Sequence, residues 1–227
     1  MPALTIGAEA VHLGFFGSLL AVLGVTWFVN LYNFMDGIDG IAAVEAVVAG
    51  TAGALLLATR QPSLGLVSLL LAAGSAGFLA WNWPPARLFM GDVGSGFLGF
   101  LFAGIALASE NAGAVPALLW FVVLGPFFVD ATITLTRRMA RGQRWSAPHR
   151  THGYQRAVQS GWSHGLVSVA VGAMSAAGGV LAWLVLQRPS LLAPSMALSA
   201  AVLAAVYVAV EWRWPMPGKE KASDHLQ

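Results

Sequence analysis

The sequence predicts an all-α polytopic membrane protein, and three observations support that fold class. Of the 227 residues, 57% are hydrophobic and 10% are charged, and the mean hydropathy is +0.71. Soluble domains carry about 25% charged residues, which excludes a soluble protein. Apolar runs of membrane-spanning length recur along the chain, and none alternates like a barrel strand. Because backbone groups must pair internally in lipid, these runs are expected to be helices within a bilayer.

About seven runs are predicted to be transmembrane helices, each near the roughly 20 apolar residues that cross the hydrocarbon. They are 14–32, 42–59, 64–82, 94–109, 114–135, 164–187 and 191–211, within a membrane domain of residues 1–212. Residues 213–227 form a predicted cytoplasmic tail. The chain has no cysteine, which excludes disulfides and thiolate metal sites. Its net charge of +2 is too small to indicate a nucleic-acid partner.

The distribution of Lys and Arg predicts the orientation, because cytoplasmic loops are enriched in both. With the loop 137–163 in the cytoplasm, ten of the twelve basic residues lie inside, and Arg60 and Arg188 lie outside. The same orientation places three polar motifs, described below, at the cytoplasmic face. It also leaves the N-terminus outside, although residues 1–13 show no signal-peptide pattern. We therefore expect the chain to be the C-terminal part of a longer protein, or to receive its N-terminal helices from elsewhere.

The first polar motif, residues 30–40, reads NLYNFMDGIDG. Its polar side chains Asn30, Asn33, Asp36 and Asp39 are three residues apart, so neighbouring pairs share one helix face. Carboxylates are costly near lipid, and such a cluster indicates a functional site. A glycine-rich joint between two helices with capping aspartates is the alternative, but capping does not require four polar side chains.

The second motif lies in residues 81–96, between two apolar runs. Pro84 and Pro85 end the preceding helix, and Asp92 and Ser95 stand at the start of the next. A helix N-terminus suits a phosphate, and the carboxylate of Asp92 suits Mg²⁺. A diphosphate substrate would use both features. The alternative is a helix N-cap behind a tight glycine turn.

The third motif is His149-Arg150-Thr151-His152, in a basic loop. Two imidazoles three residues apart can address one ligand, although two alone do not make a zinc site. Contact of a positive-inside loop with anionic lipid is the alternative, and it accounts for the other arginines of the loop. These arginines are Arg137, Arg138, Arg141 and Arg144.

These three motifs, in this order, resemble those of the polyprenyl-phosphate N-acetylhexosamine-1-phosphate transferases of glycosyltransferase family 4. Members of that family start peptidoglycan, O-antigen and teichoic-acid assembly on a lipid carrier. The resemblance implies a fold of about ten membrane helices in the bacterial plasma (inner) membrane, of which this chain would carry the C-terminal part. It implies transfer of N-acetylhexosamine-1-phosphate from a UDP-sugar to polyprenyl phosphate, with release of UMP. The implied cofactor is Mg²⁺, or Mn²⁺ in its place, and a homodimer is compatible with the family.

The resemblance also implies roles for individual residues. The implied catalytic residues are Asp36, Asp39, Asp92, His149 and His152, with Asp92 as the metal ligand. The implied substrate-binding residues are Asn30, Asn33, Asn82, Phe89, Gly91, Ser95 and Arg150, with Asn82 and Phe89 near the uracil. The string His-Arg-Thr-His departs from the unbroken histidine triplet of the peptidoglycan enzymes and is closer to the branch that loads simpler sugars for surface polysaccharides.

The family's adjacent aspartate pair, upstream of the first motif, does not occur in this sequence. Half of the site is therefore expected to lie elsewhere, and a non-catalytic fragment or subunit is one alternative. A membrane transporter or flippase is another, because it would also bury charge. Among the other acidic residues, Asp130 is expected to pair with a basic residue of the loop, Glu45 to line the cavity of Asp39, and Glu110 to lie in an outer loop.

Overall fold

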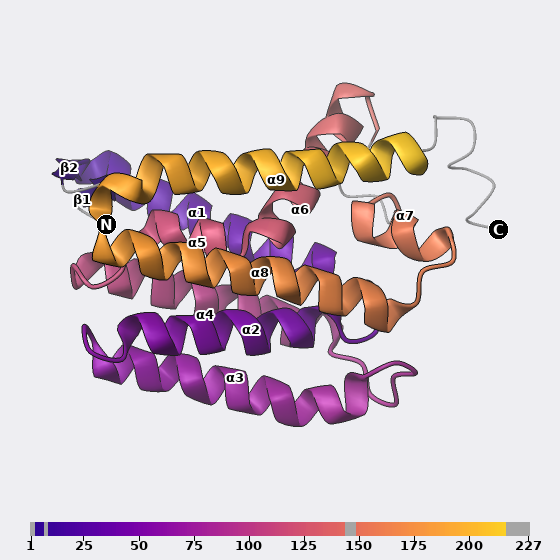
Figure 1. The fold of residues 1–227 in the computed structure, drawn as a ribbon, viewed down its shortest axis with the longest axis horizontal. Helices are drawn as coiled ribbons and strands as arrows, with labels where there is room; N and C mark the ends of the chain where they lie inside the picture. The colour runs from indigo at the N-terminus through magenta and orange to yellow at the C-terminus, as the bar shows by residue number, and fades with distance from the viewer. Residues whose placement is uncertain (1–2, 7–8, 144–148, 217–227) are drawn as a thin grey trace.

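The computed structural model describes residues 3–6, 9–143 and 149–216, and it confirms an all-α polytopic membrane protein. Its helices run back and forth along one axis, as Figure 1 shows. The helices are α1 (Gly14–Met35), α2 (Ile41–Leu57), α3 (Pro62–Asn82), α4 (Gly91–Asn111), α5 (Ala117–Val123), α6 (Gly125–Ala140), α7 (Gly153–Gln159), α8 (His164–Gln187) and α9 (Leu192–Arg213). A 3₁₀ turn, η1 (Pro189–Leu191), joins α8 to α9. A two-stranded antiparallel sheet precedes α1, formed by β1 (Ala3–Ile6) and β2 (Glu9–His12).

Each predicted span corresponds to helical structure, with two differences in form. Among the described residues, five helices are long and apolar enough to cross a membrane: α1, α3, α4, α8 and α9. The run 42–59 forms the shorter apolar helix α2, and the run 114–135 is divided between α5 and α6, which meet at 84°. Pro126 in the first turn of α6 explains the break, because proline starts a helix more readily than it continues one. Counted as one broken span, this pair raises the total to six.

Helix α2 lies between α3 and α8 (Figure 1). Small residues make this close packing feasible, as is common between membrane helices. A Cβ atom added at Gly53 would collide with the indole of Trp120, and one added at Gly50 would press on the backbone of α3 at Ser68. The fully buried rings of Tyr32, Phe102 and Trp120 fill the space between α1, α4 and α5.

The two ends of the bundle differ in charge. The small sheet lies at one end, where Glu110 accepts hydrogen bonds from the backbone nitrogens of Thr5 (2.8 Å) and Ala117 (2.6 Å). Glu110 is thus buried at that end instead of free in an outer loop. Arg60 lies there too and donates to the carbonyl of Leu186. Most of the described arginines lie at the opposite end, which agrees with the predicted asymmetry.

Candidate functional site

The three polar motifs meet at the end of the bundle away from the sheet. That end is formed by the last turns of α1, α3, α6 and α9 and by the first turns of α2, α4 and α8, with α7 packed beside them (Figure 1). Three of the hydrogen bonds described below connect residues that are 62, 120 and 129 positions apart. The predicted convergence of the motifs on one face is therefore present in the fold.

The first and second motifs share buried hydrogen bonds. Ser95 of α4 is fully buried, and its hydroxyl donates to the side-chain oxygen of Asn33 at 2.7 Å. Asn82, at the end of α3, accepts from the backbone nitrogen of Gly40 at 3.0 Å and donates to the carbonyl of Leu88 at 2.9 Å. Asn82 is buried, so its amide holds the two motifs together.

Asp39 links three segments. Its Oδ2 accepts from the backbone nitrogen of Ala86 at 3.1 Å and lies 3.4 Å from Nδ1 of His164. Its carbonyl oxygen accepts from the hydroxyl of Ser168, also on α8. The predicted catalytic carboxylate is thus engaged in joining the α1–α2 turn to the loop after α3 and to α8. The role of His164 was missed from the sequence, which places it outside the three motifs.

Asp36 and Asp92 form a pair of carboxylates from the first two motifs. Asp36 caps the end of α1 and is partly buried, whereas Asp92 is exposed in the first turn of α4. Burial, and secondly the charge of Asp92, raises the pKa of Asp36 from 3.8 to about 7. A positive φ of 66° at Gly91 turns the chain into α4 immediately before Asp92. Two like charges that act on each other in this way favour a proton or a cation between them.

The described residues contain no group of three or more acidic, histidine or cysteine side chains that could hold a metal ion by themselves. Mg²⁺ commonly takes one or two carboxylates and completes its shell with water and substrate phosphates. The Asp36–Asp92 pair is compatible with that mode of binding, since both residues supply hard oxygen donors.

The histidine motif is attached to α6 through Asp130. The two carboxylate oxygens of Asp130 accept from the backbone nitrogens of Gly153 (2.8 Å) and Tyr154 (3.0 Å) at the start of α7. Nδ1 of His152 lies 3.5 Å from Oδ1 of Asp130. The expected partner of Asp130 in the loop is therefore His152, and the helix N-terminus contributes two further donors.

His149 and His152 lie together, as their spacing suggested. Their rings are stacked with centroids 4.9 Å apart, and His152 is buried while Arg150 between them is exposed. Burial, followed by the charges of His152 and Arg138, lowers the pKa of His149 to about 3. The His149 imidazole is therefore neutral at physiological pH and can donate or accept a hydrogen bond, but it does not supply a cation.

Helix α7 also packs directly on the first motif. The hydroxyl of Tyr154 donates to the carbonyl oxygen of Phe34 at 3.0 Å. A Cβ atom added at Gly37 would overlap that hydroxyl. The glycine at position 37 therefore permits the close contact between the first and third motifs.

Two predicted substrate-binding residues are not drawn into this network. Asn30 lies within α1 and donates to the carbonyl of Thr26, one turn earlier. Phe89 is 73% exposed in the loop before α4, so its ring is free to contact a ligand.

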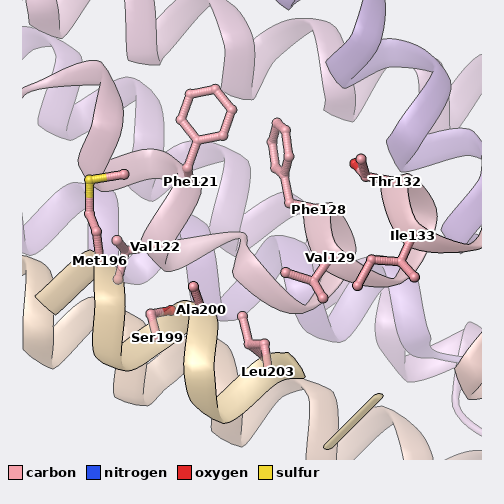
Figure 2. Close-up of a pocket in the computed structure, with 10 residues that line it drawn as sticks. All are labelled: Phe121, Val122, Phe128, Val129, Thr132, Ile133, Met196, Ser199, Ala200 and Leu203. Atoms are coloured by element: carbon pink, nitrogen blue, oxygen red, sulfur yellow. The ribbon is translucent and has the colours of Figure 1, made fainter. Parts of the chain in front are cut away.

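Two apolar pockets flank the bend between α5 and α6. One, of about 300 Å³, lies between the bent pair and α9, where the rings of Phe121 and Phe128 stand side by side (Figure 2). The other, of about 310 Å³, is lined by α6, α8 and α9 and extends to Asp130, Gly153 and Tyr154. The second pocket therefore borders the anchor of the histidine motif.

The sequence model of glycosyl transferase family 4 matches residues 2–110. A probable undecaprenyl-phosphate N-acetylglucosaminyl 1-phosphate transferase of Bacillus subtilis is 32% identical over 159 residues, which are 69% of this chain and 44% of that protein. A phospho-N-acetylmuramoyl-pentapeptide-transferase of Streptococcus pneumoniae is 39% identical over 106 residues, which are 46% of this chain and 32% of that protein. The chain spans less than half the length of these curated relatives.

Proposed function

Because this chain belongs to glycosyl transferase family 4 through residues 2–110, we propose that it contributes to a polyprenyl-phosphate sugar-1-phosphate transferase of cell-surface polysaccharide synthesis. The donor would be a UDP-N-acetylhexosamine and the acceptor polyprenyl (undecaprenyl) phosphate. One observation carries the proposal: the Asp36–Asp92 pair and the His149–His152 motif meet at one end of a membrane bundle. A membrane-bound acceptor and a water-soluble donor would meet at such a place.

In the proposed reaction, a phosphate oxygen of the lipid attacks the phosphorus next to the sugar. A new P–O bond joins lipid and sugar phosphate, and the P–O bond to UMP breaks, so that UMP leaves with the bridging oxygen. Such transfers depend on positioning and on stabilisation of phosphate charge. Three negatively charged groups must be held close together, and the site must provide opposing charge and hydrogen-bond donors.

Asp36 and Asp92 are the residues that would hold Mg²⁺, or Mn²⁺ in its place. A divalent cation there supplies a positive charge that offsets the diphosphate and the departing UMP. Ser95 and Asn33 keep the first turn of α4 against the end of α1, and this contact fixes the spacing of the two carboxylates. Asp39 and Asn82 contribute to the same spacing, because their hydrogen bonds hold the α1–α2 turn against the end of α3 and the loop after it.

The third motif would hold phosphate oxygens. Arg150 is exposed and offers a forked set of N–H donors that suits phosphate. His149, neutral by its lowered pKa, would add a hydrogen bond without competing for the cation. The exposed ring of Phe89 suits stacking on the uracil, which is worth about 1–3 kcal/mol in other base–aromatic contacts.

The pocket between α6, α8 and α9 suits the first isoprene units of the acceptor. Its walls are mostly apolar, and its inner end reaches Gly153 and Tyr154 beside the histidine motif. The excess of arginine at this end supports a cytoplasmic site in the bacterial inner membrane. Transporters usually bind their cargo near the bilayer midplane, so a site at the end of the bundle favours transfer chemistry over transport.

The test is UMP release from UDP-N-acetylglucosamine in membranes that contain polyprenyl phosphate, with and without Mg²⁺. The protein is expressed from Met1 and, separately, from any in-frame start upstream. Mg²⁺-dependent release that Asp92→Asn lowers at least about 100-fold would support the proposal, since loss of one such electrostatic contact commonly costs that much. Arg60→Gln, at the opposite end of the bundle, is the matched control. Unchanged release by the Asp92 variant would overturn the metal assignment.

A further inference from the structure

The third motif leads directly into α7, with His152 as the N-cap, but α7 has only seven residues, Gly153–Gln159. A helix this short is marginal in isolation and takes its position from its contacts. Two of these contacts are already described: Asp130 at the start of α7, and the hydrogen bond from Tyr154 to Phe34. A third contact joins α7 to α9, the last helix of the bundle.

That third contact is the buried guanidinium of Arg156. Its side chain is 2% exposed, and Nη1 donates to Oε2 of Glu211 (2.6 Å) and to the carbonyl oxygen of Trp214 (2.6 Å). The guanidinium also lies over the ring of Tyr207, 5.5 Å from its centroid. Within the described residues, its Nε and Nη2 have no hydrogen-bond partner. Glu211 is therefore the main compensation for this buried charge.

Glu211 is shared with a second arginine. Arg137 of α6 donates to Oε1 from Nη2 (2.7 Å), and its Nη1 lies 2.7 Å from Oε2. Arg137 is more exposed than Arg156, and it belongs to α6, whereas Arg156 belongs to α7. The two arginines thus contact the same carboxylate from different helices.

We propose that Glu211 and Arg156 are positioning residues that hold α7 on α9 and thereby fix His149 and His152 relative to Asp36 and Asp92. Neither residue belongs to a polar motif of the sequence, and both lie outside residues 2–110. A buried charge that loses its partner is strongly destabilised, so removing Glu211 weakens the attachment of α7 to α9. The placement of α7 stands on the contacts alone, whereas its consequence for turnover depends on the proposed function.

The first test measures the position of α7 directly, and the absence of cysteine makes the chain suitable for it. Spin labels are attached to cysteines that replace Ser160, just after α7, and Leu88, in the loop before α4; both side chains are exposed. The distribution of distances between the two labels is expected to broaden in Arg156→Met and in Glu211→Ala. Arg137→Met is the matched control, since it removes a contact of Glu211 that does not involve α7, and it should leave the distribution narrow.

The second readout is the chemical reactivity of His152, and it can be measured in a variant that folds too poorly for spin labelling. His152 is buried, so its reaction with diethyl pyrocarbonate should rise about tenfold when α7 is released, in proportion to local opening. The isosteric Glu211→Gln variant can keep part of the hydrogen bonding. Its His152 should therefore react at a rate between those of the parent and of Glu211→Ala. Equal effects of the two arginine variants, or no effect of Arg156→Met, would overturn the proposal.

UMP release completes the test. Arg156→Met should lower kcat by about 10- to 100-fold, as expected when a catalytic group is misplaced by about 1 Å, and should change KM for the UDP-sugar less. Arg137→Met should stay within about twofold of the parent. If the parent releases no UMP, but the label distances still broaden in Arg156→Met and not in Arg137→Met, the positioning role stands and the result counts against the proposed function alone.

Discussion

The hydroxyl of Ser95 donates a 2.7 Å hydrogen bond to the side-chain oxygen of Asn33, across 62 residues of sequence. The bond ties the first turn of α4 to the last turn of α1. Asp92 stands three residues before Ser95, and Asp36 stands three residues after Asn33. The distance between the two carboxylates therefore depends on a buried contact that neither of them makes.

Replacing Ser95 with alanine is expected to destabilise the fold and to reduce Mg²⁺-dependent UMP release. Loss of the hydroxyl leaves the partly buried oxygen of Asn33 without its donor, which costs about 0.5–1.5 kcal/mol. Thermal unfolding in detergent and initial rates measure the two effects. Ser109→Ala is the control, because Ser109 is a buried serine of the same helix near the other end, bonded to Trp120. Equal rate losses in the two variants would argue against a link between Ser95 and the site.

The sequence was sufficient to predict that the three motifs share one face. Polar side chains are excluded from lipid, and successive spans return to the same side at every second loop, so the alternation of runs determines the face. Pro126 could also have indicated the break between α5 and α6, because proline commonly begins a helix. The sequence predicts seven spans, whereas α2 is shorter than a membrane-spanning helix and most of its residues are buried.

The internal bonding of the site could not be predicted from the sequence. Asn82 and Asp39 lie in motifs that suggest ligand contacts, but their polar atoms are used to join loops. That use depends on how the end of α3 and the loop after it pack against the turn before α2, which no local pattern encodes. Glu211 lies at the end of an apolar run and gives no local signal of its role, because its partners come from α6 and α7.

Replacing Gly37 with alanine is expected to displace α7. The new Cβ atom would overlap the hydroxyl of Tyr154, and this contact also fixes the start of α7. UMP release should fall at least about tenfold, since small misplacements of positioned groups are costly. The double variant Gly37→Ala/Tyr154→Phe removes the overlapping hydroxyl and should recover part of the rate. Gly74→Ala, where an added Cβ meets no atom within 4 Å, is the control for the glycine change itself.

The stabilising effect of Mg²⁺ is expected to depend on pH through Asp36. Its pKa is raised to about 7, so protons compete with the cation below pH 7, and added Mg²⁺ should raise the unfolding temperature more at pH 8 than at pH 6. Without Mg²⁺, stability is expected to depend on pH in the opposite direction and to fall as the pH rises. A carboxyl whose pKa rises on folding favours the folded state at low pH, and that contribution is lost between about pH 4 and pH 7. Asp36→Asn should remove both dependences, and a Mg²⁺ effect of equal size at both pH values would contradict the assignment.

Glu45 and Ser175 provide a test of packing inside the membrane. Glu45 is fully buried in α2, and the hydroxyl of Ser175 on α8 lies 2.9 Å and 2.8 Å from its two carboxylate oxygens. The pair joins α2 and α8, in place of the predicted contact of Glu45 with the cavity of Asp39. Ser175→Ala should destabilise the fold by about 1–3 kcal/mol, because it leaves the carboxyl without this donor.

Glu45→Leu combined with Ser175→Ala should cost less than the sum of the two single changes, because replacing both polar partners by apolar groups leaves nothing buried and unpaired. Thermal unfolding of the four proteins in one detergent gives the coupling energy. Glu45→Gln serves as the reference, since its amide can still bond to Ser175. Strict additivity would mean that the short distances between Glu45 and Ser175 do not stabilise the bundle, and that α2 is held on α8 by its small residues alone.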